Sequence, residues 1–425
     1  MTLLKNWAGN YQYASPTVHE PETVDEIRRI VAGATQIHAL GARHSFCGVA
    51  DAAELVSLEK LDLPVEIDRE NMTVTAPAGI RYGNLALLLE AEGLALHNMA
   101  SLPHITLAGA VSTATHGSGN ASQNLASAVV GLELVTSDGE LRQFTRADPD
   151  FAGMVVSLGA LGVFTRVTLR VEPTFMVVQR IYEKLPWSAV EEDFDGLMST
   201  CSSVSLFTDF GETVNQLWLK NRVTDDASQI LPDSCLGAIA SIQKRHPMDS
   251  YTGEACTEQF GVPGVWHERL PHFKLEFTPA SGAEIQAEYM VARSQAAQAI
   301  AAIREIAPKF RHMLLVSEIR TIAADDLWLS TAYQQDTVGI HFSWKLDQTG
   351  VDQVLPEVEA ALAPFSPRPH WAKHFLMPEV DLADRYPRMG DFRQLMAKLD
   401  PRGAFRTPYL ERWVLGVRQD SPSVV

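Results

Sequence analysis

Three short segments carry polar side chains at alternating positions: Glu318-Ile-Arg320, His341-Phe-Ser343 and Gln286-Ala-Glu288. Each lies in a run otherwise typical of a buried strand, where residues i and i+2 project from the same face. There they could orient hydroxyl groups and stabilise an oxygen that becomes negatively charged. One such pair can be a structural ion pair, but three strands with a polar face predict the floor of a polar pocket. Lys373, beside Trp371 in a proline-rich turn, is a further candidate, with an exposed lysine as the alternative.

A second candidate is a long uncharged segment, because the chain has no Asp, Glu, Lys or Arg between Glu92 and Glu133. Prolines, glycines, histidines and hydroxyl residues interrupt every apolar run well short of the ~18 residues of a membrane span. The small residues from Ser101 to Gly119 let the backbone approach a ligand, and exposed N–H groups could hold an anion without cations. We interpret the segment as the site of a large, buried anionic cofactor. The alternative is a tightly packed core segment.

His44 lies in the turn Gly41-Ala-Arg-His-Ser45, directly after a short predicted strand. A lone histidine in a turn is usually a surface or hydrogen-bonding residue. Because His104 and His116 lie in the uncharged segment, all three histidines could line one ligand site. An esterase oxyanion loop at His116 is excluded, since the chain has no Gly-x-Ser-x-Gly nucleophile elbow.

Two apparent metal motifs do not have the required geometry. His267 and His272 are spaced i, i+5, and Pro271 interrupts any helix between them. His370 and His374 are spaced i, i+4, but the surrounding sequence favours extended backbone, which points the two rings apart. We therefore predict no metal. The early strand is not followed by Gly-x-Gly-x-x-Gly, which argues against a Rossmann dinucleotide site.

The elements that position these residues change in character near Pro173. Before it, helical and extended patterns alternate: the capping box Thr23-Val-Asp-Glu26 opens a helix, Gly93 ends another over residues 82–91, and Ser137-Asp-Gly139 forms a hairpin turn. After it, the chain is richer in aromatic and charged residues. Expected strands cover residues 38–40, 72–76, 164–171, 176–181, 216–223, 284–291, 313–319 and 338–345, and further helices cover 295–306, 354–363 and 392–399.

This order of elements predicts an α+β fold with two domains. Residues 1–173 would form a cofactor domain and residues 174–364 a substrate domain. Residues 365–425 would return to the first domain.

The bulk composition excludes several classes of protein. A net charge of −17 argues against nucleic acid or an anionic membrane as the main partner. The N-terminus has no basic segment followed by an apolar one, so we expect no signal peptide. The four cysteines lie far apart and form neither a zinc site nor a disulfide framework, which favours a cytoplasmic protein.

Several motifs together resemble one family. These are Gly41-Ala-Arg-His-Ser-Phe46, Asn98-Met-Ala-Ser-Leu-Pro-His104, Ala114-Thr-His-Gly-Ser-Gly119, Cys256-Thr-Glu-Gln-Phe-Gly-Val-Pro-Gly264 and Arg368-Pro-His-Trp-Ala-Lys373. They are similar to the alditol (xylitol) oxidases, which are vanillyl-alcohol-oxidase-type flavoproteins, and they cover nearly the whole chain in the right order. The resemblance implies a two-lobed FAD-binding domain, a β-sheet substrate domain that covers the isoalloxazine, and a C-terminal return.

The resemblance also implies roles for individual residues. His44 would bind the 8α carbon of the flavin covalently, and Gly162-Val163 would contact the adenine side. The remaining cofactor-binding positions would be Gly41, Ala42, Arg43, Ser45, Ser101, Thr106, Gly109, Ala110, Ser112, Thr113, His116, Gly117 and His370. The substrate pocket would contain Ser101, Gln286, Glu318, Arg320, Ser343 and Lys373, with His341 near the flavin.

The chain departs from the family pattern at a few positions. Gly41-Ala-Arg43 precedes the linking histidine, where the family often has Gly-Ser-Gly or Gly-Thr-Arg, so the backbone is less free at position 43. Ser343 and Thr407 replace the usual threonine and asparagine. None of these changes removes a charged or covalent function. Flavoproteins with two covalent links use a cysteine near the second motif, and the chain has none there, so the prediction is a single link through His44.

The implied reaction is oxidation of the terminal hydroxyl of a polyol to an aldehyde, with O₂ reduced to hydrogen peroxide. Glu318, Arg320, Lys373 and His341 would be the catalytic residues. A neutral His341 or a Lys373 with a lowered pKa would take the proton. The alternatives are a flavin dehydrogenase of a sugar lactone that uses another acceptor, and a non-catalytic flavin or sugar binder. Ala100 leaves room for O₂ and favours the oxidase. We expect a monomer.

Overall fold

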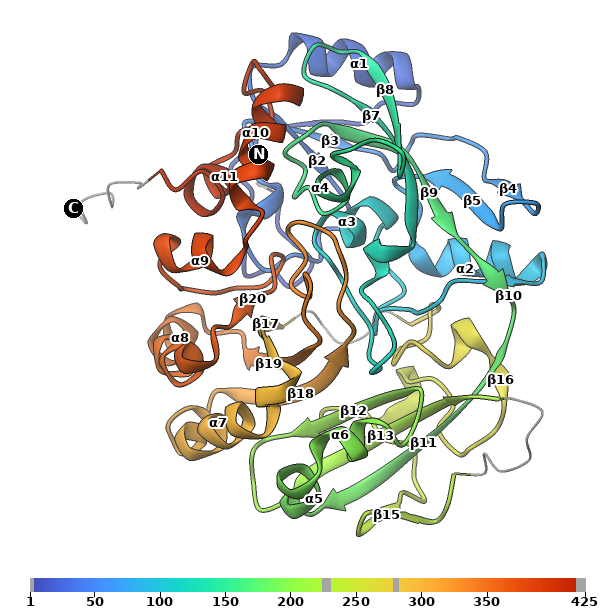
Figure 1. The fold of residues 1–425 in the computed structure, drawn as a ribbon, viewed down its shortest axis with the longest axis vertical. Helices are drawn as coiled ribbons and strands as arrows, with labels where there is room; N and C mark the ends of the chain where they lie inside the picture. The colour runs from blue at the N-terminus through green and yellow to red at the C-terminus, as the bar shows by residue number, and fades with distance from the viewer. Residues whose placement is uncertain (1–3, 224–230, 278–282, 418–425) are drawn as a thin grey trace.

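The computed structural model describes residues 4–223, 231–277 and 283–417. Residues 1–3 of the predicted cofactor domain and residues 418–425 of the predicted C-terminal segment lie outside these ranges. Two small α/β lobes lie beside a large antiparallel sheet (Figure 1). The predicted α+β class is confirmed. The predicted boundaries at residues 173 and 364 stay predictions.

The first lobe contains a three-stranded parallel sheet and the helix α1 (Val24–Gly33). The helix begins as its sequence predicts, because Thr23 Oγ1 accepts a hydrogen bond from Glu26 N at 3.2 Å. Ile27 and Val31 bury its apolar side. The strands, in sheet order, are β1 (Thr17–His19), β3 (Glu54–Ser57) and β2 (Ile37–Leu40).

The second lobe contains a five-stranded antiparallel sheet. The helix α2 (Tyr82–Ala91) covers the predicted residues, and Gly93 follows it with φ +71°, a conformation that suits glycine at the end of a helix. The strands, in sheet order, are β4 (Glu66–Asp68), β5 (Thr73–Pro77), β9 (Val163–Arg170), β7 (Val129–Val135) and β8 (Leu141–Thr145). Smaller elements are β6 (Leu94–Ala95), which pairs with β10 (Glu172–Pro173), α3 (Leu107–Ser112) and α4 (Phe151–Val155).

The large sheet has ten strands. In order along the sheet they are β14 (Ser234–Cys235), β15 (Ala238–Ala240), β11 (Met176–Leu185), β13 (Val214–Arg222), β12 (Ser203–Thr208), β18 (Leu314–Ile322), β19 (Thr337–Lys345), β17 (Glu284–Ala292) and β20 (Arg368–Pro369), and β16 (Gly264–Val265) pairs with β11. Strand β12 is not among the expected strands, because all its residues are buried and the alternation that marks a half-buried strand is absent.

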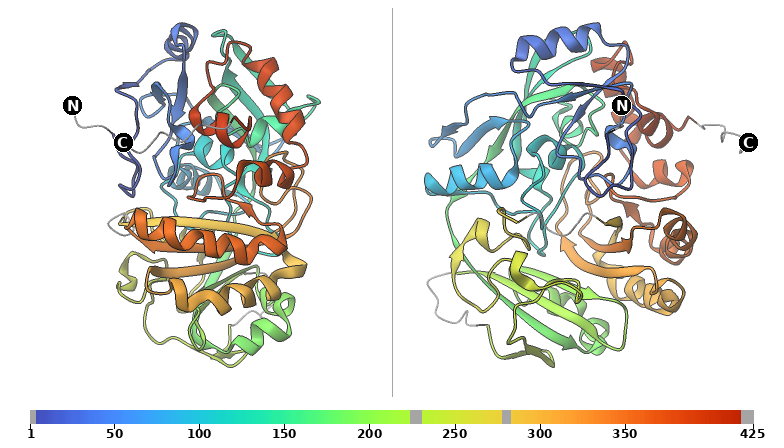
Figure 2. Two further views of the ribbon diagram at one scale, coloured as in Figure 1. Left: turned by 90° about the vertical axis from the view of Figure 1, so that its left-hand side faces the viewer. Right: turned by 180° about the vertical axis from the view of Figure 1, so that it is seen from behind.

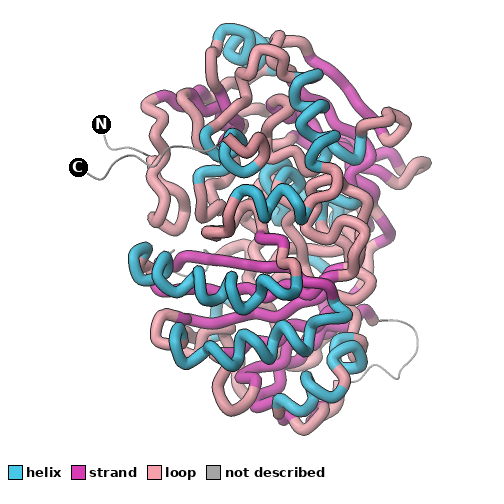
Figure 3. The backbone as a smooth tube through the Cα atoms, turned by 60° about the vertical axis from the view of Figure 1, so that its left-hand side comes forward, coloured by secondary structure: helices cyan, strands magenta, loops and turns pink. Residues whose placement is uncertain are grey.

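Two long helices cover one face of this sheet. Figures 2 and 3 show α7 (Ala296–Phe310) and α8 (Gln348–Leu362) side by side along it. Their buried residues include Ile300, Ile303 and Leu355, so the apolar sides of these helices cover that face. The other face is left to line a cavity. Two short helices, α5 (Trp187–Glu192) and α6 (Phe194–Met198), lie between β11 and β12 in the chain.

The C-terminal segment leaves the large sheet after β20 and returns to the first lobe (Figure 1). Ile37 N donates to Ala404 O at 2.8 Å, and Phe46 N donates to Ala372 O at 2.7 Å. Arg402 donates to Ala34 O of the first lobe at 2.9 Å and to Ser137 O of the second lobe at 2.6 Å. The helices of this segment are α9 (Glu379–Arg385), α10 (Met389–Leu399) and α11 (Pro408–Trp413). Within the described residues, no helix is both long and apolar enough to cross a membrane.

Candidate active site

A cavity of about 380 Å³ lies between the two lobes and the free face of the large sheet. Its walls come from the 41–45 turn, the uncharged segment, the loop before β9, strands β17, β18 and β19, and the turn after β20. Residues from nearly the whole length of the chain therefore meet around one space. The predicted site residues that line it are Gly41, Ala42, Arg43, His44, Ser45, Ser101, Thr106, Gly109, Ala110, Ser112, Thr113, His116, Gly162, Gln286, Glu318, Arg320, His341, Ser343, His370 and Lys373.

Two predicted cofactor-binding residues lie behind the wall. A Cβ on Gly117 would lie 2.6 Å from Met99 O, so this glycine allows close packing of the chain against itself. The Val163 side chain is fully buried in the apolar core. Neither residue is among those that line the cavity, so their contact with the cofactor stays a prediction.

The 41–45 turn brings a buried histidine to the cavity. Arg43 adopts φ +61°, a left-handed conformation that costs a non-glycine residue energy, and the turn carries the His44 ring to within 5.2 Å of the Trp7 ring, on which it stacks. A Cβ on Gly41 would lie 2.5 Å from Thr106 Oγ1, so the turn packs tightly on the uncharged segment. Burial and the nearby His104 lower the pKa of His44 to about 4, and its Nδ1 has no hydrogen-bond partner among the described residues.

The floor of the cavity follows from the register of the large sheet. Glu318 on β18 pairs with His341 on β19, which in turn pairs with Glu288 on β17. Two residue pairs along, Gln286 and Ser343 are opposite each other. Because residues two apart share a face, these side chains and Arg320 project into the same cavity.

Arg320 lies between two buried carboxylates. Its Nη2 donates to Glu288 Oε1 at 2.7 Å, and its Nε lies 3.5 Å from Glu318 Oε2. Nη1 reaches Ser101 Oγ at 3.5 Å. Burial alone would raise the pKa of both carboxyl groups, but the guanidinium outweighs it and holds both pKa values well below their usual range. The two charges in turn raise the pKa of Arg320 against the effect of burial. All three groups are therefore ionised.

Lys373 and His341 are the groups on this floor that could exchange a proton. Lys373 Nζ donates to Gln286 Oε1 from the turn after β20. Burial lowers the pKa of Lys373. Burial and the Lys373 charge lower the pKa of His341 to about 3, so this ring is neutral at pH 7. His341 Nδ1 is buried without a hydrogen-bond partner in the described part of the chain.

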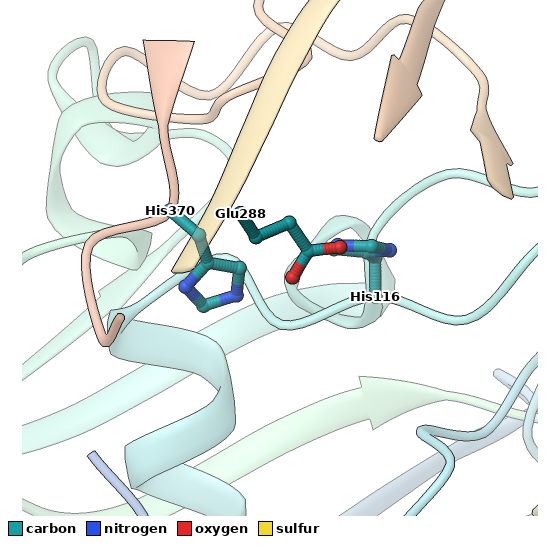
Figure 4. A group of neighbouring side chains, drawn as sticks. All are labelled: His116, Glu288 and His370. Atoms are coloured by element: carbon teal, nitrogen blue, oxygen red, sulfur yellow. The ribbon is translucent and has the colours of Figure 1, made fainter. Parts of the chain in front are cut away.

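Glu288 also lies between His116 and His370, as Figure 4 shows. One ligand atom from each of the three residues lies within 4.8 Å of the others, a spacing that a metal ion could bridge. However, Arg320 already donates to Glu288, and a dication would have to compete with that fixed charge. His370 Nδ1 accepts a hydrogen bond from Ala372 N at 3.1 Å. Among the described residues, the two histidines lie beside the carboxylate that pairs with Arg320, so this cluster is better explained as holding Glu288 against Arg320. The absence of a metal stays a prediction. His374 instead contacts Asp352 of α8, so the two rings of the His370 motif do diverge.

Comparison with known proteins identifies the family. Residues 16–145 match a family of FAD binding domains, and residues 282–413 match the D-arabinono-1,4-lactone oxidase family. An alditol oxidase from a Streptomyces species is 44% identical over 96% of this chain and 98% of its own length. The chain belongs to the alditol oxidase family of FAD flavoproteins. It is an FAD-dependent oxidoreductase.

More distant relatives of this alditol oxidase homologue are named for other substrates. An L-gulono-1,4-lactone dehydrogenase from Mycobacterium tuberculosis is 26% identical over 97% of this chain and 99% of its own length. Mouse L-gulonolactone oxidase is 26% identical over 96% and 97%. Among solved structures, cholesterol oxidase from B. sterolicum covers 97% of this chain and 96% of its own with a TM-score of 0.77 at 15% identity, which shows a shared fold.

The residues around the cavity of this alditol oxidase homologue fit FAD. The His44 ring lines the cavity, and its Nδ1 is buried without a partner among the described residues. The walls beside it consist mostly of small uncharged residues, with Arg43, Arg81 and Lys373 as nearby cations. A Cβ on Gly159 would lie 2.3 Å from His38 Nε2, and Gly159 adopts φ +73°, so this wall requires glycine. The interpretation of the uncharged segment as part of the FAD-binding domain is confirmed by the match over residues 16–145.

Several residues of the site could not be assigned from the sequence. Glu288 was noted for its spacing but not assigned, and the structure pairs it with Arg320. Glu284 lies behind Gln286 and accepts a hydrogen bond from it. His272 was considered only as a metal ligand, yet its Nε2 lies 2.8 Å from Glu318 Oε1. Strand alternation could have suggested Glu284 and Glu288, but no local pattern relates His272 to Glu318.

Proposed function

We propose that the protein oxidises the terminal primary hydroxyl of a sugar alcohol, such as xylitol or sorbitol, to the aldose, with FAD bound covalently through His44 and O₂ reduced to hydrogen peroxide. The alditol oxidase at 44% identity supports a polyol substrate. The observation that carries the proposal is a polar floor on which Glu318, Arg320 and Lys373 face one cavity with the His44 turn. Binding a neutral polyol does not need two cations, whereas stabilising an alkoxide does.

Arg320 and Lys373 would stabilise the alcohol oxygen as it loses its proton. A well-placed donor of this kind lowers the activation barrier by about 3 kcal/mol. The two carboxylates beside Arg320 keep its guanidinium in one position before substrate arrives, so little reorganisation is needed.

The hydroxyl groups of the polyol would be bound by the remaining polar residues of the floor and wall: Ser101, Gln286, Glu318 and Ser343. Of these, Gln286, Glu318 and Ser343 are buried, so a deoxy analogue would leave a polar group unpaired away from water. Sites of this kind discriminate strongly against substrates that lack the hydroxyl. We therefore expect polyols to be preferred over simple alcohols.

The proton of the reacting hydroxyl would pass to His341 or Lys373. His341 is neutral at pH 7 with a free Nδ1, and burial lowers the pKa of Lys373 towards the range in which it can exchange a proton. FAD, when bound, supplies the acceptor for the hydride. His44, with its pKa lowered to about 4 by burial, would present a neutral ring nitrogen for covalent attachment.

The test is an oxidase assay with purified holoenzyme and xylitol or sorbitol. Peroxide formed in air in step with oxygen consumption supports the proposal. The alternative, a dehydrogenase of a sugar or aldonolactone, is suggested by the more distant lactone dehydrogenase. It would reduce a dye without oxygen, accept L-gulono-1,4-lactone and form little peroxide. Ala100 lines the cavity beside Ser101, where a small side chain leaves room for O₂ and favours the oxidase.

A further inference from the structure

Lys220 is a buried lysine that none of the proposed roles uses. It lies on β13 and is 2% exposed. Its Nζ donates to Leu270 O at 2.5 Å and to Pro271 O at 3.2 Å, and lies 3.1 Å from His272 Nδ1. The carbonyl oxygens can only accept. An ammonium group has three hydrogens, so Lys220 in its charged form can donate to all three neighbours.

The contacts with Lys220 and with the ionised Glu318 together determine the tautomer of His272. Because Nδ1 accepts from the ammonium, the ring proton lies on Nε2, which donates to Glu318 Oε1 at 2.8 Å. Phe207 and Trp218 pack edge-on against the ring, with centroid distances of 5.4 and 5.0 Å, and hold its orientation. Burial and the Lys220 charge lower the pKa of His272 to about 4, so the ring is neutral near pH 6.

The segment that Lys220 contacts, residues 270–273, also carries part of the cavity wall. The backbone N–H groups of His272 and Phe273 donate to Ser101 O at 3.1 and 3.2 Å. Glu318, on the other side of the His272 ring, has its second oxygen 3.5 Å from Arg320 Nε. A continuous chain of polar contacts thus runs from Lys220 through His272 and Glu318 to Arg320.

We propose that Lys220 and His272 are a positioning pair for Glu318: the charged lysine holds the Nε2–H tautomer of His272, and this tautomer holds the Glu318 carboxylate in line with Arg320. The proposal deepens the proposed function and rests on it, because Glu318 there orients Arg320 and binds polyol hydroxyls. His272 lines the cavity and Lys220 lies behind it, so both act through Glu318.

The pair has this form only within a range of pH. Burial lowers the pKa of Lys220 to about 7, while Glu318 and Cys256 raise it and Arg320 lowers it. These groups and His272 are the titratable and charged side chains that face the ammonium among the described residues. Measurements at pH 6 therefore keep Lys220 charged and His272 neutral.

The test compares Lys220→Met, His272→Gln and the double variant of the holoenzyme. Glutamine places an amide N–H near the position of His Nε2, so it can still donate to Glu318 but has no tautomer to fix. The rate constant for flavin reduction by xylitol, and the apparent Kd for xylitol, are measured without oxygen at pH 6. Lys345→Met, at the exposed end of β19, is the matched control.

We expect Lys220→Met to lower the reduction rate about 10- to 100-fold with flavin content unchanged, the range seen when a group that orients a catalytic side chain is lost. In the His272→Gln background the same change should cost less than about threefold, because there is no tautomer left to lose. Equal losses in both backgrounds, or a Lys220→Met rate within about twofold of the wild type, would overturn the proposal.

An independent measurement requires neither turnover nor the Lys220→Met variant. The ¹⁵N signals of the His272 ring in the wild-type protein, assigned by comparison with His272→Gln, report where the proton lies. An Nε2–H tautomer at pH 6 supports the proposal, and an Nδ1–H tautomer or an imidazolium overturns it. If none of the polyols tested reduces the flavin, the proposed function fails. The spectrum still shows which tautomer His272 adopts, so it tests the role of Lys220 separately.

Discussion

Replacing Lys373 with methionine would remove one of the two cations that face the floor of the cavity while keeping a side chain of similar length. Lys373 Nζ donates to Gln286 Oε1 and lies 5.2 Å from the centroid of the Phe46 ring. Methionine can fill the space against Phe46, so the change removes charge and donors more than volume.

The magnitude follows from the role of the ammonium group. A donor aimed at an oxygen that becomes negatively charged contributes about 3–4 kcal/mol, which corresponds to a rate about 100- to 1000-fold lower after its removal. Gln286 Oε1 also loses a charged donor, a hydrogen bond worth about 1.5–3 kcal/mol, but this loss does not depend on the charge that develops on the alcohol oxygen. We therefore expect a large effect on flavin reduction and a small one on the apparent Kd for xylitol.

The assay is anaerobic stopped-flow reduction of the flavin by xylitol, after absorbance has established equal flavin content. Lys345→Met serves as the control, because Lys345 is exposed at the end of β19. A reduction rate for Lys373→Met within about tenfold of the wild type would refute the reasoning, because the remaining Arg320 would then suffice to stabilise the alkoxide.

Three further outcomes are expected. In His44→Ala the yellow colour should move from the acid-precipitated pellet to the supernatant; colour retained in the pellet would place the link elsewhere. Glu288→Gln should lower the free energy of unfolding by about 3 kcal/mol, because Arg320 loses a buried charge partner, and urea titration that finds no change would contradict this. Stability should fall as the pH is lowered from about 6.5 towards 4. The pKa values of His272 and His341 are lowered to about 4 and about 3, so both rings stay neutral in the folded protein, whereas both take up a proton in the unfolded chain. Each ring therefore lowers the free energy of unfolding by about 1.4 kcal/mol per pH unit in this range. Unfolding curves at pH 7 and pH 5 that coincide would exclude this coupling.

The elements with strong local signals could be predicted from the sequence. The capping box at Thr23 and the glycine at Gly93 mark helix ends because each satisfies backbone groups within a few residues. The polar alternation on β17, β18 and β19 likewise predicts a shared face, since the side-chain period of a strand is a local property.

What could not be predicted depends on contacts between distant segments. Lys220, His272 and Glu318 lie on three different segments, and no local pattern relates one to the next. Gly117 carries a family motif, yet its close neighbour is Met99 O, a contact that only the folded chain reveals. β12 was missed because burial on both faces removes the alternation on which strand prediction depends.

The return of the C-terminal segment has a consequence for synthesis of the protein. Lys373 and His370 are made more than 300 residues after the His44 turn, yet they complete the wall that lies opposite this turn. The bond from Phe46 N to Ala372 O joins the two ends directly. Contacts of such long sequence separation form late, so the emerging chain has no closed cavity until almost all of it has left the ribosome. An incomplete chain would thus lack the closed site in which the proposed oxidation takes place.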